Sequence, residues 1–455
     1  MCSQIDGRDS VLPVVLFDRS AMGISLAVHI VLAVVGIALP AMIAIYEYLG
    51  IKRNDSDYLT IARRLTTALI VLFAVGTASG FVVAASFFFA WPPFMQLVGN
   101  VAILPLYLES FSFFGEAILI AVYVYSSGRL KSKYGRAVVM GMVSFFAALT
   151  ASLITMINAF MNTPAGFDIG KYIAGGQITG VNPLAVFNTP STWIEISHVV
   201  TTSFYTGAFV LVMFLAYKMH KRSITDRERQ LYRKALGPAV AVALLFTVLS
   251  ILTGIASITT LYAQQPEKYA AMELDMVPMA FAPEYIGGFY VNGHVVDGIP
   301  IPGLQSILAT GSPSGTVPGL SQYPQSSWPP LIIHFMFDLM IGLALLTGLV
   351  LLIVLMLKIL KREIFPRLVL IGLVASGAIA LFVLEDGWVL AELGRQPWIV
   401  YNVLTVAKAA NTSPTILPVL IGIIVFYIVI IPLTLFVLKR IFDSRPLAGE
   451  LGVKR

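Results

Sequence analysis

Long runs of apolar residues make up most of this chain, and short polar or charged segments separate them. Nine runs reach the roughly 20 residues that a helix needs to cross a hydrocarbon core of ~30 Å. They lie at about 20–48, 62–90, 101–127, 136–161, 192–219, 236–262, 330–359, 366–392 and 416–440. This pattern predicts an all-α integral membrane protein with nine transmembrane helices.

The composition agrees with a membrane protein. The 455 residues are 58% hydrophobic and 12% charged, whereas a soluble domain carries about 25% charged residues. Cys2 is the one cysteine, which excludes an internal disulfide, a thiolate cluster and a covalently attached CxxCH haem. Any metal must therefore be held by histidine, methionine or carboxylate side chains.

The positive charges predict the orientation. An odd number of spans places the two termini on opposite sides of the membrane. The loops that face one side hold all but six of the 30 lysines and arginines; those six are Arg8, Arg19, Lys171, Lys268, Arg395 and Lys408. Because basic loops stay in the cytoplasm, we expect the N-terminus outside and the C-terminus in the cytoplasm.

Two loops on the predicted outer side are long. Residues 162–191 and 263–329 are rich in glycine and proline, and the second loop, after helix 6, begins with the helix-like stretch YAQQPEKYAAMELDMV. Loops of this length are usually functional or disordered, and we expect an ordered, partly helical outer cap. The chain then divides into membrane helices 1–6 (1–262), the outer loop (263–329) and membrane helices 7–9 with the cytoplasmic tail (330–455).

Several ionisable side chains lie inside the predicted spans. They are His29, Glu109, Glu116, Glu195, His198, His334, Asp338, Glu385, Asp386 and Glu392. A charge in the bilayer is costly, so such a residue suggests a functional site. For any single residue, a polar contact between helices or a side chain that reaches the membrane surface explains the position equally well.

Depth in the membrane separates some of these residues from the rest. At 1.5 Å per residue, His29, Glu109, His198, Met340 and Glu392 all fall within about 15 Å of the outer surface. Histidine, methionine and carboxylate without thiolate suit haem iron better than zinc or an iron–sulfur cluster. A proton-coupled transporter would use the same carboxylates but has no need of Met340, although methionine alone is more often a packing residue.

Glu109 and Glu116 are seven residues apart, so they project from one face of their helix, about 10 Å apart along its axis. Two acids in line from the predicted site toward the cytoplasm suit proton delivery. The alternative is a pair of hydrogen bonds between helices.

Several short motifs resemble those of one family along nearly the whole chain, namely subunit I of the cytochrome bd quinol oxidases. The motifs are GTASGF (76–81) followed by Trp91 and Pro92, PLYLES with FFGEA, INAFMNTPAGF (157–167), SHVVTTSFYTGAF (197–209), FDLM (337–340) and GRQPW (394–398) preceded by Gly387, Trp388 and Glu392. The nine spans and the large loop after helix 6 match the family as well.

The resemblance implies the haem ligands. His198 and Met340 would ligate a low-spin haem b. His29 and Glu392 would serve two high-spin haems, a haem b and a haem d or a further haem b, and Glu109 would lie against one of them. Which high-spin haem takes which ligand stays open.

The resemblance also implies a quinol site and a haem environment. Lys268 and Glu273 match the Lys-x-x-x-x-Glu spacing of the family's quinol-binding loop. Arg395 and Trp388 would support haem propionates and packing, since a guanidinium fork suits carboxylates.

Four features depart from the family's pattern. Asp338 stands where the family usually has arginine and should lower the potential of the low-spin haem. Ala84 replaces a common glutamate. Glu109 and Glu116 are seven residues apart instead of eight, and the second half of the outer loop is short. The chain therefore resembles a divergent member.

These residues together predict the haem-bearing subunit of a quinol:oxygen oxidoreductase, multi-pass in the cell membrane of a prokaryote. It would oxidise quinol at the outer face and reduce O2 to water with cytoplasmic protons, separating charge without pumping. The expected partners are subunit II or a paralogous second subunit, small single-span subunits, quinol and O2, with no nucleic acid. The alternatives are a paralogous electron-transfer partner that does not reduce oxygen and, less favoured, a proton-coupled transporter.

Overall fold

The computed structural model describes residues 6–126, 132–221, 223–360, 366–413 and 416–451. Within these ranges, nine helices are long and apolar enough to cross a membrane, as the hydrophobic pattern predicts. They are α1 (Asp6–Lys52), α2 (Ser56–Ala90), α4 (Ile103–Tyr125), α5 (Gly135–Asn162), α7 (Thr192–His220), α8 (Asp226–Gln264), α11 (Ile332–Ile359), α12 (Arg367–Leu393) and α14 (Ile416–Ser444).

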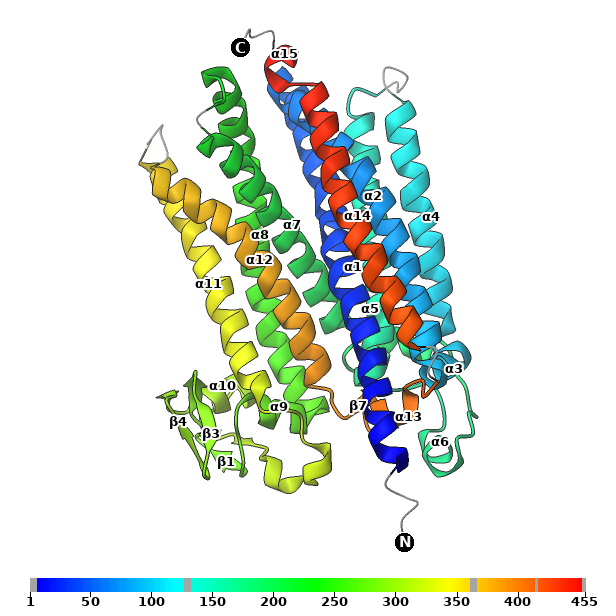
Figure 1. Ribbon diagram of the computed structural model, residues 1–455. Coiled ribbons are helices and arrows are strands. Elements are labelled where there is room, and N and C mark those ends of the chain that lie inside the picture. Colours follow the sequence, from blue (N-terminus) through cyan, green and yellow to red (C-terminus); the bar gives the residue numbers. More distant parts are fainter. Residues whose placement is uncertain (1–5, 127–131, 222, 361–365, 414–415, 452–455) are drawn as a thin grey trace.

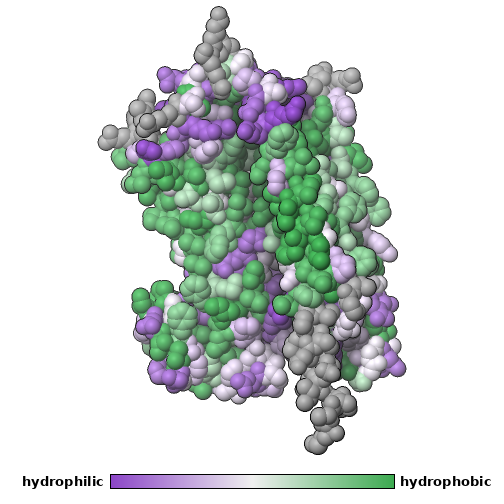
Figure 2. Space-filling model, viewed as in Figure 1, coloured by the Kyte–Doolittle hydropathy of each residue, from purple (hydrophilic) through white to green (hydrophobic). Residues whose placement is uncertain are grey.

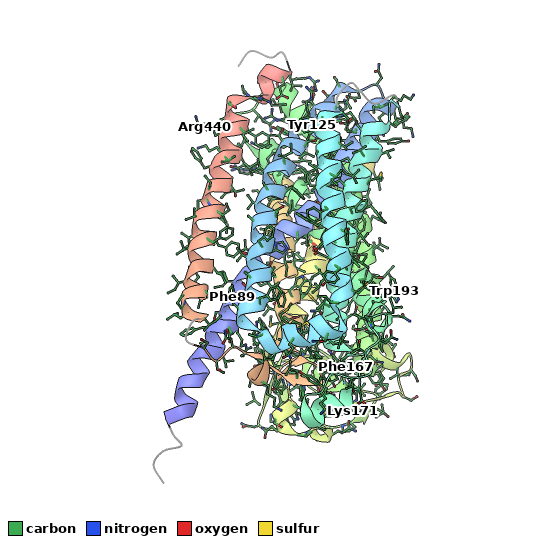
Figure 3. The ribbon with its side chains drawn as sticks, turned by 90° about the vertical axis from the view of Figure 1, so that its right-hand side faces the viewer. Phe89, Tyr125, Phe167, Lys171, Trp193 and Arg440 are labelled. Carbon is green, nitrogen blue, oxygen red and sulfur yellow. The ribbon has the colours of Figure 1, made fainter. Side chains whose placement is uncertain are left out.

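The nine helices run side by side as one bundle (Figure 1). The N-terminus and the strands lie at one end, and the C-terminus lies at the other. In the side view, Lys171 and Phe167 mark the first end, and Tyr125 and Arg440 mark the second (Figure 3). Following the prediction from loop charge, we call these the outer end and the cytoplasmic end.

A broad apolar surface covers the middle of the bundle, and hydrophilic residues gather at the cytoplasmic end (Figure 2). Large apolar side chains face outward from most spans, among them Phe111, Leu352 and Ile428. A contiguous apolar surface of this size is stable only when hydrocarbon or another protein covers it.

Helix α7 is the centre of the bundle and contacts α1, α5, α8 and α12. Small residues allow its closest approaches. A Cβ added at Gly207 would lie 2.3 Å from Ala38 Cβ of α1, and one added at Gly377 of α12 would lie 2.3 Å from Met213 Cβ of α7. Membrane helices pack through such small-residue contacts because lipid gives no hydrophobic drive for association.

Short elements connect the spans. The short helices are α3 (Pro92–Val101), α6 (Ile169–Gly175), α9 (Pro266–Met272), α10 (Leu304–Thr310), α13 (Val406–Ala409), α15 (Leu447–Glu450) and the 3-10 turns η1 (Ala185–Asn188), η2 (Leu320–Gln322) and η3 (Gln325–Ser327). The hydrophobic pattern predicted no separate helix at α3. This helix, which one residue separates from α2, begins at a Pro-Pro pair because proline is favoured in a first helical turn.

The outer loop is partly helical, through α9 and α10, and also contains paired strands that the sequence pattern did not reveal. The pairs are β1 (Met279–Ala280) with β6 (Thr316–Val317), β2 (Glu284–Ile286) with β5 (Ile299–Ile301), and β3 (Phe289–Val291) with β4 (His294–Val296), all antiparallel. A fourth pair, β7 (Trp398–Val400) with β8 (Leu404–Thr405), follows α12. Strands of two or three residues are too short for a readable alternation.

The outer loop packs onto the membrane helices through one apolar cluster. Tyr269 of α9, Val317 of β6 and Leu320 of η2 are buried with Ile333 of α11 and Leu390 of α12. The loop is therefore anchored on the two helices that carry Met340 and Glu392.

We expect Gly207→Ala to destabilise the bundle, because the new methyl group would overlap Ala38 of α1. Overpacking typically costs about 1–3 kcal/mol, and thermal unfolding of the purified membrane complex measures it. Gly36→Ala is the matched control, since a Cβ at Gly36 meets nothing within 4 Å. Equal unfolding temperatures for the two variants would contradict the close packing of α1 on α7.

Candidate functional site

Arg395, just after the end of α12, is the largest side chain that is fully buried in the described residues, with 2% exposure. Its Nη2 donates hydrogen bonds to both oxygens of Glu392, each at 2.5 Å, and its Nη1 donates to Asn162 Oδ1 at 2.9 Å. The Glu392 side chain is 42% exposed, so this carboxylate lies at the edge of the packed protein. The charge of a buried guanidinium is thus neutralised by one carboxylate one turn away.

Asn162 joins this ion pair to three other elements. Its side chain at the end of α5 donates to Glu195 Oε1 of α7 at 2.9 Å. It accepts from Gln265 Nε2, between α8 and α9, at 3.1 Å. Asn158, one turn earlier on α5, donates to Glu392 Oε1 at 3.4 Å. A single network of hydrogen bonds therefore joins α5, α7, α9 and α12 beneath the outer loop.

Lys268 of α9 enters the same network. Its Nζ donates to the carbonyl oxygen of Ala391 at 3.1 Å, and its stem lies against Gly394, where a Cβ would be 2.5 Å from Lys268 Cε. Burial, together with the positive charge of Arg395, lowers the pKa of Lys268 to about 8, although Glu195 and Glu392 oppose this shift. The structure therefore places Lys268 beside Glu392.

Glu273, five residues along, faces a different set of side chains. It is 3% exposed, and burial together with the charges of Glu284, Asp275 and Asp338 raises its pKa well above the usual range. Burial likewise raises the pKa of Asp275 to about 8 and that of Glu284 to about 7. Four carboxyl groups thus share one partly desolvated region, so some of them hold protons near neutral pH.

His334 of α11 is the basic side chain that lies against this carboxyl cluster. Its Nε2 lies 3.5 Å from Asp338 Oδ2 and 3.1 Å from the Gly287 carbonyl oxygen, and its Nδ1 is bonded to the Met272 carbonyl oxygen at 2.8 Å. Asp338 also accepts a hydrogen bond from the Gly287 backbone N–H. Asp338, expected near the low-spin haem, is therefore tied to the outer loop.

The structure places His29 and His198 in matching surroundings. His29 Nδ1 of α1 is hydrogen-bonded to Ser79 Oγ of α2 at 2.8 Å, and His198 Nδ1 of α7 to Thr253 Oγ1 of α8 at 3.0 Å. Metal-bound histidines usually hydrogen-bond through the nitrogen that does not bind the metal, which fixes the ring. In both residues this arrangement leaves Nε2 as the nitrogen for a metal.

Each of the three predicted ligands on α1, α7 and α11 also faces a glycine on a neighbouring helix. A Cβ would lie 3.2 Å from His29 Cε1 if added at Gly80, 3.7 Å from His198 Cε1 if added at Gly254, and 3.1 Å from Met340 Sδ if added at Gly387. Residues without a side chain at these points keep space beside the ring or sulfur atom.

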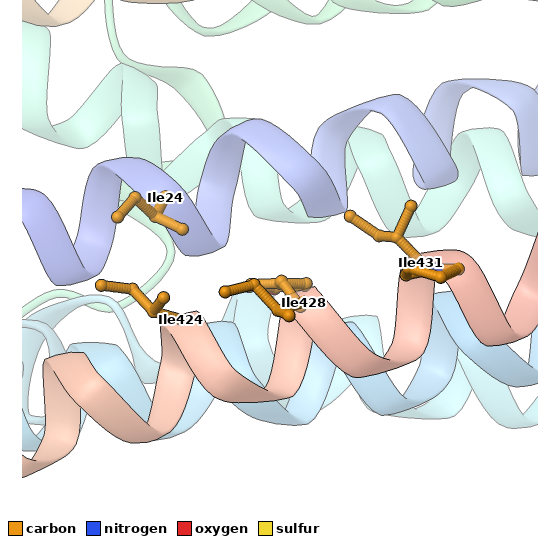
Figure 4. Close-up of a pocket in the computed structure, with 6 residues that line it drawn as sticks. Ile24, Ile424, Ile428 and Ile431 are labelled. Carbon is orange, nitrogen blue, oxygen red and sulfur yellow. The ribbon is translucent and has the colours of Figure 1, made fainter.

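The remaining predicted residues differ in how deeply they are buried. Glu116 is buried on α4, Glu109 is half-buried two turns nearer the outer end, and Trp388 is half-buried on α12 one turn before Glu392. Glu385 and Asp386 each have one buried carboxylate oxygen without a hydrogen-bond partner in the structure described here. An open groove between α1 and α14, lined by Ile24, Ile424, Ile428 and Ile431 (Figure 4), contains none of the candidate ligands.

The donor set fits haem. Among the described residues, no three His, Cys, Asp or Glu side chains converge as a set that could hold a metal ion. Haem iron needs only one or two axial side chains because the porphyrin supplies its equatorial ligands. Single histidines fixed through Nδ1, a methionine sulfur and adjacent glycines meet that requirement.

Residue spacing alone did not identify the groups around the predicted ligands. Ser79 and Gly80 lie in GTASGF, and Asn158 and Asn162 lie in INAFMNTPAGF, but neither motif by itself indicates a role for these residues. Thr253, Gly254, Glu284 and Gln265 carried no signal, because a hydroxyl, a glycine or a loop carboxylate is ordinary in its local sequence.

The fold and this donor set define a multi-pass membrane protein suited to bind haem. The family model for cytochrome bd terminal oxidase subunit I matches residues 17–446, and the chain belongs to that family.

Known proteins agree over nearly the whole chain. A protein of Bacillus subtilis (strain 168) named "Putative cytochrome bd menaquinol oxidase subunit I" is 36% identical over 437 residues, covering 95% of this chain and 98% of the relative. The cytochrome bd ubiquinol oxidase subunit 1 of the same organism is 27% identical, covering 90% of each chain. The solved bd oxidase of Geobacillus thermodenitrificans has a chain that matches with a TM-score of 0.86 and 34% identity, covering 95% of this chain and 99% of that one.

Membership confirms the family resemblance seen in the sequence. The chain is a membrane oxidoreductase subunit of the cytochrome bd quinol oxidase type, which belongs to respiratory electron transport, and the family implies haem cofactors. The particular ligands and quinol-site residues stay predictions.

We expect the outer loop to lose stability as the pH rises from about 5 to 8. Because the pKa values of Glu273, Asp275 and Glu284 are raised in the folded state, the folded loop binds more protons than the unfolded loop across this range. The lowered pKa of Lys268 affects the stability of the loop only above about pH 8, where it makes the folded loop more stable as the pH rises.

Hydrogen exchange of the α9 and α10 amides, corrected for intrinsic rates, measures this stability. Protection should fall with pH in the parent protein and fall less steeply in Glu284→Gln. Protection that rises with pH would show that the carboxyl groups are ionised and paired instead of sharing protons.

Proposed function

We propose that this chain is the haem-bearing subunit of a quinol:oxygen oxidoreductase in the cell membrane of a prokaryote, assembled with subunit II or a paralogous second subunit. The observation that supports the proposal best is the repeated arrangement around His29, His198 and Met340. Each faces a glycine of a neighbouring helix, and both histidines are oriented through Nδ1.

In this proposal, His198 and Met340 would hold a low-spin haem b, and His29 and Glu392 would serve the two high-spin haems, a haem b and a haem d or a further haem b, with Glu109 nearby. When bound, the haems would supply electron storage and the redox chemistry that converts O2 to water. The protein would supply the side chains that hold them, and Arg395 balances negative charge beside Glu392.

Quinol oxidation also requires groups that accept protons at the outer end. The carboxyl cluster of Glu273, Asp275, Glu284 and Asp338 suits that role. The pKa of Asp275 is raised to about 8 and that of Glu284 to about 7, and groups with such pKa values take up and release protons at neutral pH. Lys268 of the same loop lies beside Glu392, where its buried ammonium would attract an electron-rich oxygen.

The protons that water formation consumes would come from the cytoplasmic end, along Glu116 and then Glu109 on one face of α4. Protons are then released at one end of the bundle and taken up from the other. The layout separates charge across the membrane without a pumping step.

His198→Ala should remove the low-spin haem absorbance and abolish quinol oxidation, because the imidazole that would hold this haem is lost. Reduced-minus-oxidised spectra of the purified complex measure the first effect, and quinol-driven oxygen uptake measures the second. His294→Ala, at the exposed first position of β4, is the control that should keep both. An unchanged spectrum in His198→Ala would rule out the ligand assignment. If the parent complex bound no CO, the chain would instead be the paralogous electron-transfer subunit that does not reduce oxygen.

Glu273→Gln should slow quinol-driven oxygen uptake by about 10²-fold, the usual size of a lost acid–base group, while uptake driven by an artificial haem reductant continues. Asp297→Asn, at an exposed turn of the same loop, should leave both rates unchanged. An equal fall of both rates in Glu273→Gln would show that Glu273 supports the loop structure and not quinol oxidation.

A further inference from the structure

A third polar residue continues the row of acids on α4. Glu109, Glu116 and Tyr123 follow one another at intervals of seven residues, so they lie on one face of the helix at steps of about 10 Å along its axis. Tyr123 stands two residues before the cytoplasmic end of α4. It is 1% exposed, which is unusual for a phenol so close to the end of a surface helix.

The Tyr123 hydroxyl donates to a buried carboxylate. Its acceptor is Glu47 Oε1 of α1, at 2.5 Å, and Glu47 is 6% exposed. Arg136 at the start of α5 donates from Nε to the same oxygen at 3.2 Å and from Nη1 to the Tyr123 carbonyl oxygen at 3.2 Å. Its guanidinium carbon lies 4.0 Å from the centre of the Tyr123 ring.

These contacts connect the membrane interior with the cytoplasmic surface. The Arg136 side chain is 25% exposed and the Glu47 side chain is 8% exposed. Arg136 therefore reaches solvent, whereas Glu47 contacts the buried Tyr123 hydroxyl. A carboxylate attracts protons, and a phenol can accept a proton on its oxygen while donating its own. The row on α4 then leads from that phenol to Glu116.

We propose that Glu47 and Tyr123 form the cytoplasmic inlet of the proton path that continues through Glu116 to Glu109; this inference rests on the proposed function. A hydronium ion at the cytoplasmic surface protonates Glu47. The Tyr123 O–H, which donates to Glu47 in the structure, turns toward Glu116. Glu47 then gives its proton to the Tyr123 oxygen while the phenol gives its own proton to a water, which passes it to Glu116, so that Glu47 is again a carboxylate and Tyr123 is again neutral. Arg136 holds Glu47 in position for the next proton.

A purely structural role would use the same contacts, because they tie α1, α4 and α5 together at their cytoplasmic ends. The two roles differ in what a substitution removes. Glu47→Gln keeps an oxygen that accepts from Tyr123 and Arg136 but cannot carry a proton. Glu47→Asp keeps the carboxyl group but shortens its reach. A proton inlet therefore needs the carboxyl group, whereas a helix clamp needs only the hydrogen bonds.

The test uses the complete complex with its haems, reconstituted in vesicles with quinol. Glu47→Gln should lower steady-state oxygen uptake by about tenfold or more, with haem spectra and unfolding temperature unchanged and a larger solvent deuterium isotope effect. Glu47→Asp should recover part of the rate. Tyr123→Phe should show a similar loss, and the double variant Glu47→Gln with Tyr123→Phe should be no slower than the slower single variant, as expected for two groups in one path.

Glu450→Gln is the matched control, because Glu450 pairs with Arg64 at 2.9 Å at the same end of the bundle but is 31% exposed. It should keep the parent rate. Normal oxygen uptake in Glu47→Gln would overturn the inlet, and so would a loss of rate that only accompanies a lower unfolding temperature and is not recovered by Glu47→Asp. A parent complex that fails to oxidise quinol in the same vesicles would instead contradict the proposed function.

Discussion

The structure depends on neutralising the buried charge of Arg395. A guanidinium with 2% exposure is tolerated in an apolar bundle only when its charge is neutralised. Its Nη2 donates to Glu392 and its Nη1 donates to Asn162, while its Nε has no hydrogen-bond partner among the described residues. Asn162 is in turn hydrogen-bonded to Glu195 and Gln265. Four elements far apart in the sequence are thereby held in one arrangement, directly below the outer loop.

The spans were predictable because crossing hydrocarbon imposes a minimum length and an apolar composition that show in the sequence without knowledge of the neighbours. The outer loop was not, since strands such as β1 and β6 are defined only by pairing across more than thirty residues. The same division applies to the site. His198 is visible in the sequence as an ionisable residue in an apolar run, and Met340 is visible through the FDLM motif. The roles of Thr253 and Gly387 are visible only in the structure, where α8 packs against α7 and α12 packs against α11.

The two ends of the bundle use carboxyl groups differently. At the outer end, four of them gather with one histidine, and burial raises the pKa of Glu273 and Asp275. At the cytoplasmic end, Glu47 is paired with Arg136 and bonded to Tyr123. At the outer end, carboxyl groups therefore lie against one another, whereas at the cytoplasmic end a carboxylate lies against a guanidinium and a phenol.

The position of Asp338 ties chemistry at the outer loop to α11. Its carboxylate accepts from Gly287 and lies against His334, yet only one residue separates it from Met340. If Met340 holds a haem as proposed, any charge that the outer acids gain or lose therefore lies within a single helical turn of the residue that holds it. Since such coupling is reciprocal, a change of redox state there must in turn alter how readily the acids give up their protons.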